Sequence, residues 1–245
     1  MLFTLTSVAQ EFEVGGNVSL NTSWILNQNA YEVLQEVCPD DPLIIGSEPG
    51  YALTVGYSIG AKAAYNSDRF WGLSAEVNYT KRGQNYKDNW QNNNCPGGNL
   101  LDFKRKFNLH YLELPLLVQF KSQNRGKVKG YGEVGIQLGF LMSAKEKITF
   151  SGLNESDVDF GSANDKVKRF DMGLVAGGGA QIELSDNLFL NVGLRTYFGF
   201  FDINDGGALV FVSNNDSTYQ KSRNFSAGAN IGIVYVFDWV GSLYR

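Results

Sequence analysis

Two long runs of alternating apolar and polar residues, joined by a short polar segment, lie in the middle of the chain. They cover residues 109–120 and 131–142. Successive side chains of a β-strand point to opposite faces, so this alternation predicts strands with two different environments on their two sides. Strands of soluble domains usually have about five or six residues, whereas a tilted membrane-spanning strand needs about nine to eleven. The two runs therefore predict a transmembrane β-hairpin with lipid on its apolar face.

The polar faces of these runs combine glycines with two mid-strand carboxylates, Glu113 and Glu133. This mixture suits a crowded, hydrated lumen better than an open surface. Glycine supplies 28 of the 245 residues, about 11% against an average of about 7%, and there are 17 Phe, 12 Tyr and 4 Trp. Small residues fit the interior of a narrow barrel, and aromatic residues form girdles at its two lipid–water interfaces. Trp71 and Trp239 suit the periplasmic girdle.

Six further segments alternate in the same way, which brings the number of expected strands to eight, and the connections alternate between long and short. Outer-membrane barrels have long extracellular loops, short periplasmic turns and both termini in the periplasm. We therefore predict an all-β fold, an eight-stranded antiparallel up-and-down transmembrane β-barrel with four long extracellular loops and short periplasmic turns. A soluble lipocalin-like barrel or a β-sandwich is the alternative, but neither sorts its loops by length. The six segments are residues 11–21, 51–64, 71–80, 170–184, 188–200 and 224–237, and the long connections are residues 22–49, 81–106, 145–169 and 202–223.

The first nine residues are similar to the end of a secretory signal peptide. Residues 2–6 are apolar, and Ser7 and Ala9 fit a small-x-small cleavage site before Gln10. The charged region and most of the apolar core of such a peptide are missing, so we expect a truncated remnant over residues 1–9. A disordered N-terminus or a first strand is the alternative. Residues 10–245 are expected to form a single outer-membrane barrel domain.

The two cysteines fall in the first two long connections. Cys38 lies in residues 22–49 and Cys95 in residues 81–106, so both are expected on the extracellular side. An even number of cysteines in an exported protein favours a disulfide, with free thiols as the alternative. The pair has neither CxxC spacing nor a nearby histidine, so the sequence predicts no metal site.

Five ionisable residues of the expected strands point into the lumen by parity. An eight-stranded barrel is just wide enough for its side chains to fill the interior, so opposite charges at similar depths are expected to pair into a network that plugs it. The alternative is a narrow ion path lined by carboxylates. An open pore requires many more strands. The five residues are Lys62, Glu76, Glu113, Glu133 and Arg195.

The hypothesis that this protein is an enzyme has little support in the sequence. Membrane-barrel hydrolases need a histidine that activates a nucleophile, and the one histidine of this chain, His110, falls on the lipid face by parity. We therefore predict an interfacial residue at this position, no enzymatic activity and no cofactor.

The charge of the chain bears on its partners. The formal net charge of −4 shows no basic surplus, so nucleic acid is not an expected partner. A local exception is the run Lys104, Arg105 and Lys106, which either contacts phosphates of surface lipid or forms a solvated cluster.

The central hairpin also carries a family resemblance. Residues 111–117, Tyr-Leu-Glu-Leu-Pro-Leu-Leu, followed by residues 130–135, Gly-Tyr-Gly-Glu-Val-Gly, resemble the core of a Bacteroidetes outer-membrane β-barrel family called porin family proteins. That family includes PorT-like proteins linked to type IX secretion and gliding. The resemblance implies a bacterial outer-membrane location and a structural or interaction component of the cell envelope, with outer-membrane lipid and secretion or envelope complexes as partners. A narrow porin-like channel is the alternative function, and a soluble lipocalin-like ligand binder is a more distant one.

The end of the last expected strand is similar to the signal read by the barrel-assembly machinery, which would be a further partner during biogenesis. Its features are a polar residue, a glycine and then spaced aromatic residues, here Gly232, Tyr235 and Phe237. The sequence departs from the usual pattern because eight residues follow Phe237.

Overall fold

The computed structural model consists almost entirely of β-strands. Its described residues are 11–26, 50–66, 70–91, 100–122, 126–151, 156–205 and 221–238. No helix within these ranges is long and apolar enough to cross a membrane. The predicted signal-peptide remnant, Cys38, Cys95 and Trp239 lie outside them. The strands are β1 Glu11–Leu26, β2 Gly50–Ala52, β3 Val55–Asn66, β4 Trp71–Gln91, β5 Leu100–Lys121, β6 Val128–Ser151, β7 Ser156–Ser162, β8 Phe170–Ser185, β9 Leu188–Gly199 and β10 Arg223–Asp238.

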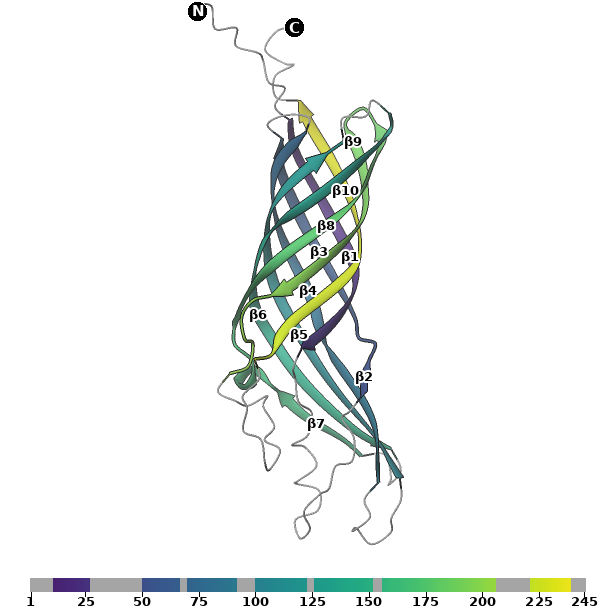
Figure 1. Cartoon of the computed structure of the whole chain (residues 1–245), viewed down its shortest axis with the longest axis vertical. Coiled ribbons are helices and arrows are strands. Elements are labelled where there is room, and N and C mark those ends of the chain that lie inside the picture. The colour runs from purple at the N-terminus through teal and green to yellow at the C-terminus, as the bar shows by residue number, and fades with distance from the viewer. Residues whose placement is uncertain are drawn as a thin grey trace, which may run out of the picture.

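Eight of these strands close into a ring, which confirms the predicted eight-stranded antiparallel barrel (Figure 1). Each strand pairs with its neighbours in sequence order, and β1 pairs with β10, so that Glu11 lies opposite both Asn66 and Asp238. The two remaining strands extend the wall. β2 pairs with the outer part of β4, and β7 pairs with the outer part of β6.

The burial pattern of the wall is inverted relative to a soluble barrel. Leu20 and Leu194 point outward with 68% and 69% of their surface exposed, whereas Glu76 and Glu13 point inward with 2% and 1% exposed. An apolar exterior around a polar interior is unfavourable in water and favourable in lipid. This excludes the soluble lipocalin-like alternative and supports the predicted outer-membrane location.

Aromatic side chains gather at two levels of the outer face. The first level lies at the periplasmic end, where β1 begins and β10 ends. There Phe12 packs against Phe237 with ring centroids 6.5 Å apart, and Trp71 lies in register with Phe120. Eight residues separate Trp71 from Tyr79 along β4. At about 3.3 Å per residue and a tilt of about 40°, the two levels are ~20 Å apart on this strand, close to the height of an apolar membrane band. The second girdle contains Tyr79, Trp24, Phe225, Phe140, Phe170 and Phe201.

Three strands continue well beyond the second girdle, into segments that the sequence assigned to loops. β4 and β5 remain paired as far as Gln91 and Leu100, and β6 runs to Ser151 (Figure 1). The boundary prediction was wrong here because it followed the apolar alternation. Above the membrane the outer face meets water, so that alternation stops while the backbone pairing continues.

A β-bulge in β6 changes which residues face the lumen. His110 pairs with Ser143 but Tyr111 pairs with Leu141, so Met142 is the extra residue. Below the bulge the odd-numbered residues of β6 point inward, and above it the even-numbered residues do. Ala144 and Glu146 are therefore buried in the interior. A one-residue shift exchanges the two faces of a strand.

An apolar cluster lies in the extracellular part of the lumen. Two of its members, Ala163 and Val167, come from the segment between β7 and β8, which packs against β6. There the backbone N–H of Ala163 donates to the Ala144 carbonyl at 2.9 Å, and the Ala144 N–H donates to Asn164 Oδ1 at 2.7 Å. Residues of this connection were expected to form a loop, yet they supply part of the core. The cluster consists of Ile25, Tyr86, Phe107, Leu109, Tyr111, Ala144, Ala163, Val167 and Ile203.

Candidate functional site

Arg195 stands at the centre of the lumen and bridges two carboxylates. From β9, its Nη1 and Nη2 donate to the two carboxylate oxygens of Glu76 on β4, at 2.7 and 2.9 Å. Its Nε donates to Oε1 of Glu133 on β6 at 2.7 Å. A planar guanidinium suits this bidentate arrangement, and such charge-assisted hydrogen bonds are among the strongest in proteins. We call these three residues the arginine clamp.

Neutral side chains complete the hydrogen bonding of the clamp. Asn17 and Asn78 donate their amide groups to Glu76 Oε2 at 3.2 and 3.0 Å, and Gln119 donates to Glu133 Oε2 at 3.1 Å. Burying an ion pair carries a large desolvation cost, which the charge attraction offsets only when the remaining lone pairs are also satisfied. These three amides meet that condition from β1, β4 and β5.

Lys62 also lies beside the clamp. It is buried with 7% of its surface exposed and is in register with Glu76 on the neighbouring strand. Its ammonium group is near enough to Glu76, Glu133 and Glu13 for all three carboxylates to act on it electrostatically. Four of the five residues expected in a lumen network are therefore together in one layer.

The fifth residue, Glu113, belongs to a different layer. Arg82 Nη2 lies 2.8 Å from Glu113 Oε1, and Thr80 donates its hydroxyl to Glu113 Oε2 at 2.8 Å. The Arg82 guanidinium also stacks over the Tyr197 ring, 4.1 Å from its centroid. Arg82 was missed at the sequence level because it lies just past the expected end of its strand.

Further ion pairs occupy the two ends of the lumen. Near the periplasmic end, Lys121 is paired with Glu13, whose Oε1 also accepts a hydrogen bond from Asn66 Nδ2 at 2.9 Å. Near the extracellular end, Arg105 Nε lies 2.6 Å from Glu146 Oε1. Neither pair was predicted from the sequence. Extending the alternation of β4 and β5 into the charged segment above the girdle would have placed Arg105 inside.

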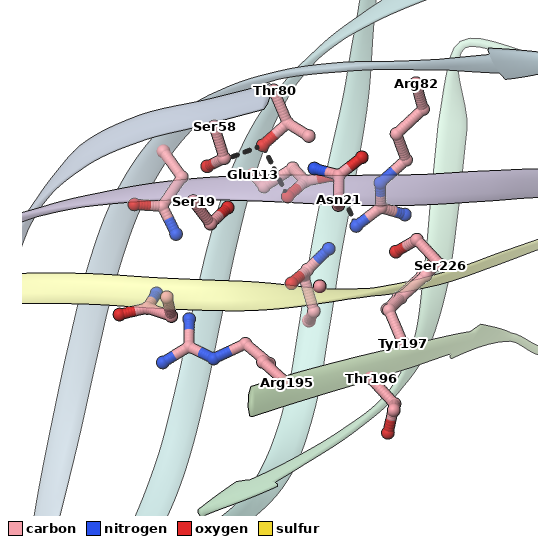
Figure 2. A pocket seen from close by; sticks show the side chains of 14 residues that line it. Ser19, Asn21, Ser58, Thr80, Arg82, Glu113, Arg195, Thr196, Tyr197 and Ser226 are labelled. Atoms are coloured by element: carbon pink, nitrogen blue, oxygen red, sulfur yellow. Dashed lines mark hydrogen bonds and ion pairs between the residues drawn. The ribbon is translucent and has the colours of Figure 1, made fainter. Parts of the chain in front are cut away.

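Two small cavities lie on either side of the clamp. The larger, about 40 Å³, lies towards the extracellular side, and Figure 2 shows Glu113, Thr80 and Arg82 on one side of it with Arg195 on the other. The smaller, about 10 Å³, lies towards the periplasm. Arg195 lines both cavities. Each has room for only one or a few water molecules, and the arginine clamp lies between them.

The residues of the expected assembly signal divide between the two faces of β10. Gly232 points inward beside the smaller cavity, where an added Cβ would lie 3.1 Å from the Gly16 carbonyl oxygen. Tyr235 and Phe237 point outward, and their rings meet edge to face with centroids 4.7 Å apart. The glycine thus permits close approach of β1, and the aromatic residues contribute to the periplasmic girdle.

His110 and the Lys104–Arg105–Lys106 run lie on the upper part of β5. His110 Nδ1 is 2.7 Å from the Tyr79 hydroxyl, and the two rings stack on the outer face. Arg105 points inward to Glu146, whereas Lys104 and Lys106 point outward. The expected cluster of three cations is therefore split between the two sides of the wall. Within the described ranges, no three His, Cys, Asp or Glu residues are grouped so as to hold a metal ion.

An apolar exterior, two aromatic girdles and a lumen filled with ion pairs define an outer-membrane β-barrel protein. Residues 8–205 match the family described as outer membrane protein beta-barrel domain, and the chain belongs to that family.

Several solved structures are similar at low sequence identity. The Neisserial surface protein A shares 16% identity at a TM-score of 0.43, with 92% of this chain and 97% of that chain covered. OprG from Pseudomonas aeruginosa shares 16% identity at a TM-score of 0.43, with 94% and 97% covered. The outer membrane protease OmpT from Escherichia coli shares 10% identity at a TM-score of 0.33, with 96% and 99% covered. No curated protein sequence matches the chain.

Proposed function

We propose that this protein is a closed, non-conducting outer-membrane barrel that acts as a structural or interaction component of the cell envelope. The arginine clamp is the observation that carries the proposal, since it joins opposite walls of the lumen through Arg195, Glu76 and Glu133. The apolar cluster at the extracellular mouth is a second barrier. A barrel closed in this way offers its loops, turns and outer face for contact rather than its interior for transport.

The proposal of a more specific, PorT-like role rests on the sequence resemblance. The segments at residues 111–117 and 130–135 support a PorT-like member of the Bacteroidetes family, with a secretion-associated role and partners in an envelope complex. They form the central hairpin of β5 and β6, whose backbone is paired from Lys121 and Tyr131 upward. The barrel-assembly machinery is the proposed partner during biogenesis. We further propose that the protein is not an enzyme, because His110 lies outside the lumen beside Tyr79.

Conductance in planar bilayers tests the closed lumen. The wild-type barrel should give no discrete conductance steps. Lys129→Ala, which removes a cation outside the clamp that lies over the Phe189 ring, should behave like the wild type and is the control for Arg195→Ala below. Steady conductance from the wild-type protein would contradict the proposal. The interaction role is tested separately by purification from native membranes in mild detergent, where a larger complex is expected to co-purify with the barrel.

The two cavities favour one alternative, a narrow channel gated by the clamp. In that case the wild-type protein would already conduct, and its single-channel current would change with Glu113→Gln in the layer above and with Arg195→Ala at the constriction. A current that depends on both residues would establish the channel function in place of the closed barrel.

A further inference from the structure

Four lysines form a basic patch on the outer face of β4, β5 and β6, just beyond the extracellular girdle. Lys81 of β4 lies opposite His110 of β5, and Lys145 of β6 lies opposite Asn108 of β5. Lys106 lies two residues beyond Asn108 towards the extracellular end of β5. Neighbouring strands are about 4.8 Å apart, so these side chains share one continuous surface. The basic patch consists of Lys81, Lys104, Lys106 and Lys145, with Lys106 and Lys145 exposed and the other two half-buried.

The level of the patch follows from its contact with the girdle. Tyr79 and His110 stack at the girdle, and Lys81 is the next outward-facing residue of β4. Lys81 and Lys145 are both near enough to His110 to act on it electrostatically. Aromatic girdles mark the head-group level of the bilayer, so the lysines immediately above them face the outer edge of the outer leaflet.

Of the acidic residues on β4, β5 and β6, those with described side chains point away from this surface. They are Glu76, Glu113, Glu133 and Glu146, and all four point into the lumen. Lys147, at the margin, lies in register with Asp159 of β7 and is not part of the basic patch. The bulge at Met142 contributes to this asymmetry, because it places Glu146 inside and Lys145 outside. The basic patch is therefore locally positive, although the net charge of the chain is −4.

We propose that the basic patch binds the phosphate groups of a phosphorylated glycolipid in the outer leaflet. Lysine ammonium groups are compact charges that bind phosphate well. The exposed aromatic surface of Tyr79 and His110 lies directly below them, where the sugar and upper acyl segments of such a lipid would rest. Charge complementarity and continuity with the lipid-facing wall both favour a membrane lipid as the occupant.

Titration of the detergent-solubilised full chain with lipid A, followed by native mass spectrometry, tests the proposal. The variant is Lys106→Gln/Lys145→Gln, which removes the two exposed cations. We expect its dissociation constant to be about 25-fold higher than that of the wild type, since each lysine near an anionic lipid surface contributes about fivefold. High salt should weaken wild-type binding and reduce the difference between the two proteins.

The matched control is Lys127→Gln/Lys129→Gln, which removes the same charge at the periplasmic turn and should bind lipid A within twofold of the wild type. A heat-modifiable gel band shows that each variant is folded. Equal binding of dephosphorylated lipid A, or equal weakening in the control, would overturn the proposal. Displacement of lipid A by millimolar inorganic phosphate would instead identify a free-phosphate site and would also overturn it.

Discussion

Arg195 and Glu76 lie on diametrically opposite strands of the ring and are joined across the lumen by two hydrogen bonds of 2.7 and 2.9 Å. Three strands separate β9 from β4 in either direction around the barrel. The diameter of the barrel is therefore spanned by two side chains, and Glu133 ties a third strand to them. The three side chains fill much of the lumen at this level. Substitutions in the arginine clamp therefore measure how far it stabilises the barrel.

Arg195→Ala should destabilise the barrel by about 3–5 kcal/mol, because Glu76 and Glu133 would remain buried without their cation. Urea unfolding in lipid vesicles, followed by tryptophan fluorescence, measures the loss. The triple variant Arg195→Met/Glu76→Gln/Glu133→Gln should recover part of it, since the two carboxylates that lose their cation are then neutral, while Lys62 keeps Glu13 as a nearby carboxylate. Lys129→Ala, which removes a cation outside the clamp, should change the free energy of unfolding by about 0.5 kcal/mol or less. A loss below about 1 kcal/mol for Arg195→Ala would show that the clamp contributes little.

Ile203→Ala should loosen the extracellular mouth without opening the ring. Ile203 is fully buried in the apolar cluster, and truncating a buried aliphatic side chain costs about 2–5 kcal/mol. Amide hydrogen exchange should show faster exchange for Ala163 and Lys168, whose N–H groups bond within this region, but not for the strands between the girdles. Asp205→Ala, an exposed neighbour, is the control. Uniformly faster exchange throughout the barrel would contradict a local role for the cluster.

Ile231→Arg tests the position of the membrane. Ile231 faces outward midway between Phe225 and Phe237 on β10, so an arginine there should cost about 2–4 kcal/mol in lipid vesicles. Leu53→Arg is the matched control, because Leu53 is 72% exposed but lies in the break between β2 and β3, on the extracellular side of the wall. That change should cost about 0–1 kcal/mol. Similar costs at both positions would contradict the predicted level of the bilayer.

A gel-shift assay tests the predicted disulfide between Cys38 and Cys95. Unboiled protein should migrate as a compact band that shifts on boiling, and reductant should shift the boiled band further. Cys38→Ser should migrate like the reduced protein. Closing a loop between the two connections would stabilise the barrel by about 2–4 kcal/mol. An unchanged boiled band after reduction would favour free thiols.

Much of the wall could be predicted from the sequence because lipid imposes a strict pattern on it. Most outward residues between the girdles are apolar, so period-two alternation identifies strands and faces together, and parity placed Lys62, Glu76, Glu133 and Arg195 inside. Which cation meets which carboxylate could not be read in the same way. The pairing of Glu113 with Arg82 depends on relative depth around a tilted ring, and parity carries no information about depth.

The upper third of the barrel was harder to predict for a different reason. Beyond the girdle both faces of the wall can be polar, so the contrast that marks a strand disappears. Phe107 and Leu109 still alternate with Asn108 and His110, but here the apolar residues face inward and the polar ones outward. In β5 the odd-numbered residues thus point inward throughout, although they change from polar to apolar along the strand. In β6 the inward-facing residues change from odd-numbered to even-numbered at Met142. The sequence gives no local signal that separates these two cases.

The bulge at Met142 also determines how this strand can vary. Deleting one residue there would leave the lower half of β6 unchanged and rotate the upper half, so that Lys145 and Lys147 would enter the lumen while Glu146 would face out, away from Arg105. An insertion or deletion anywhere else in β6 would disturb one half in the same way. A correct alignment of this strand with a relative that lacks the bulge must therefore place its gap at residue 142. Without a gap, every interior position above the bulge is compared with an exterior one.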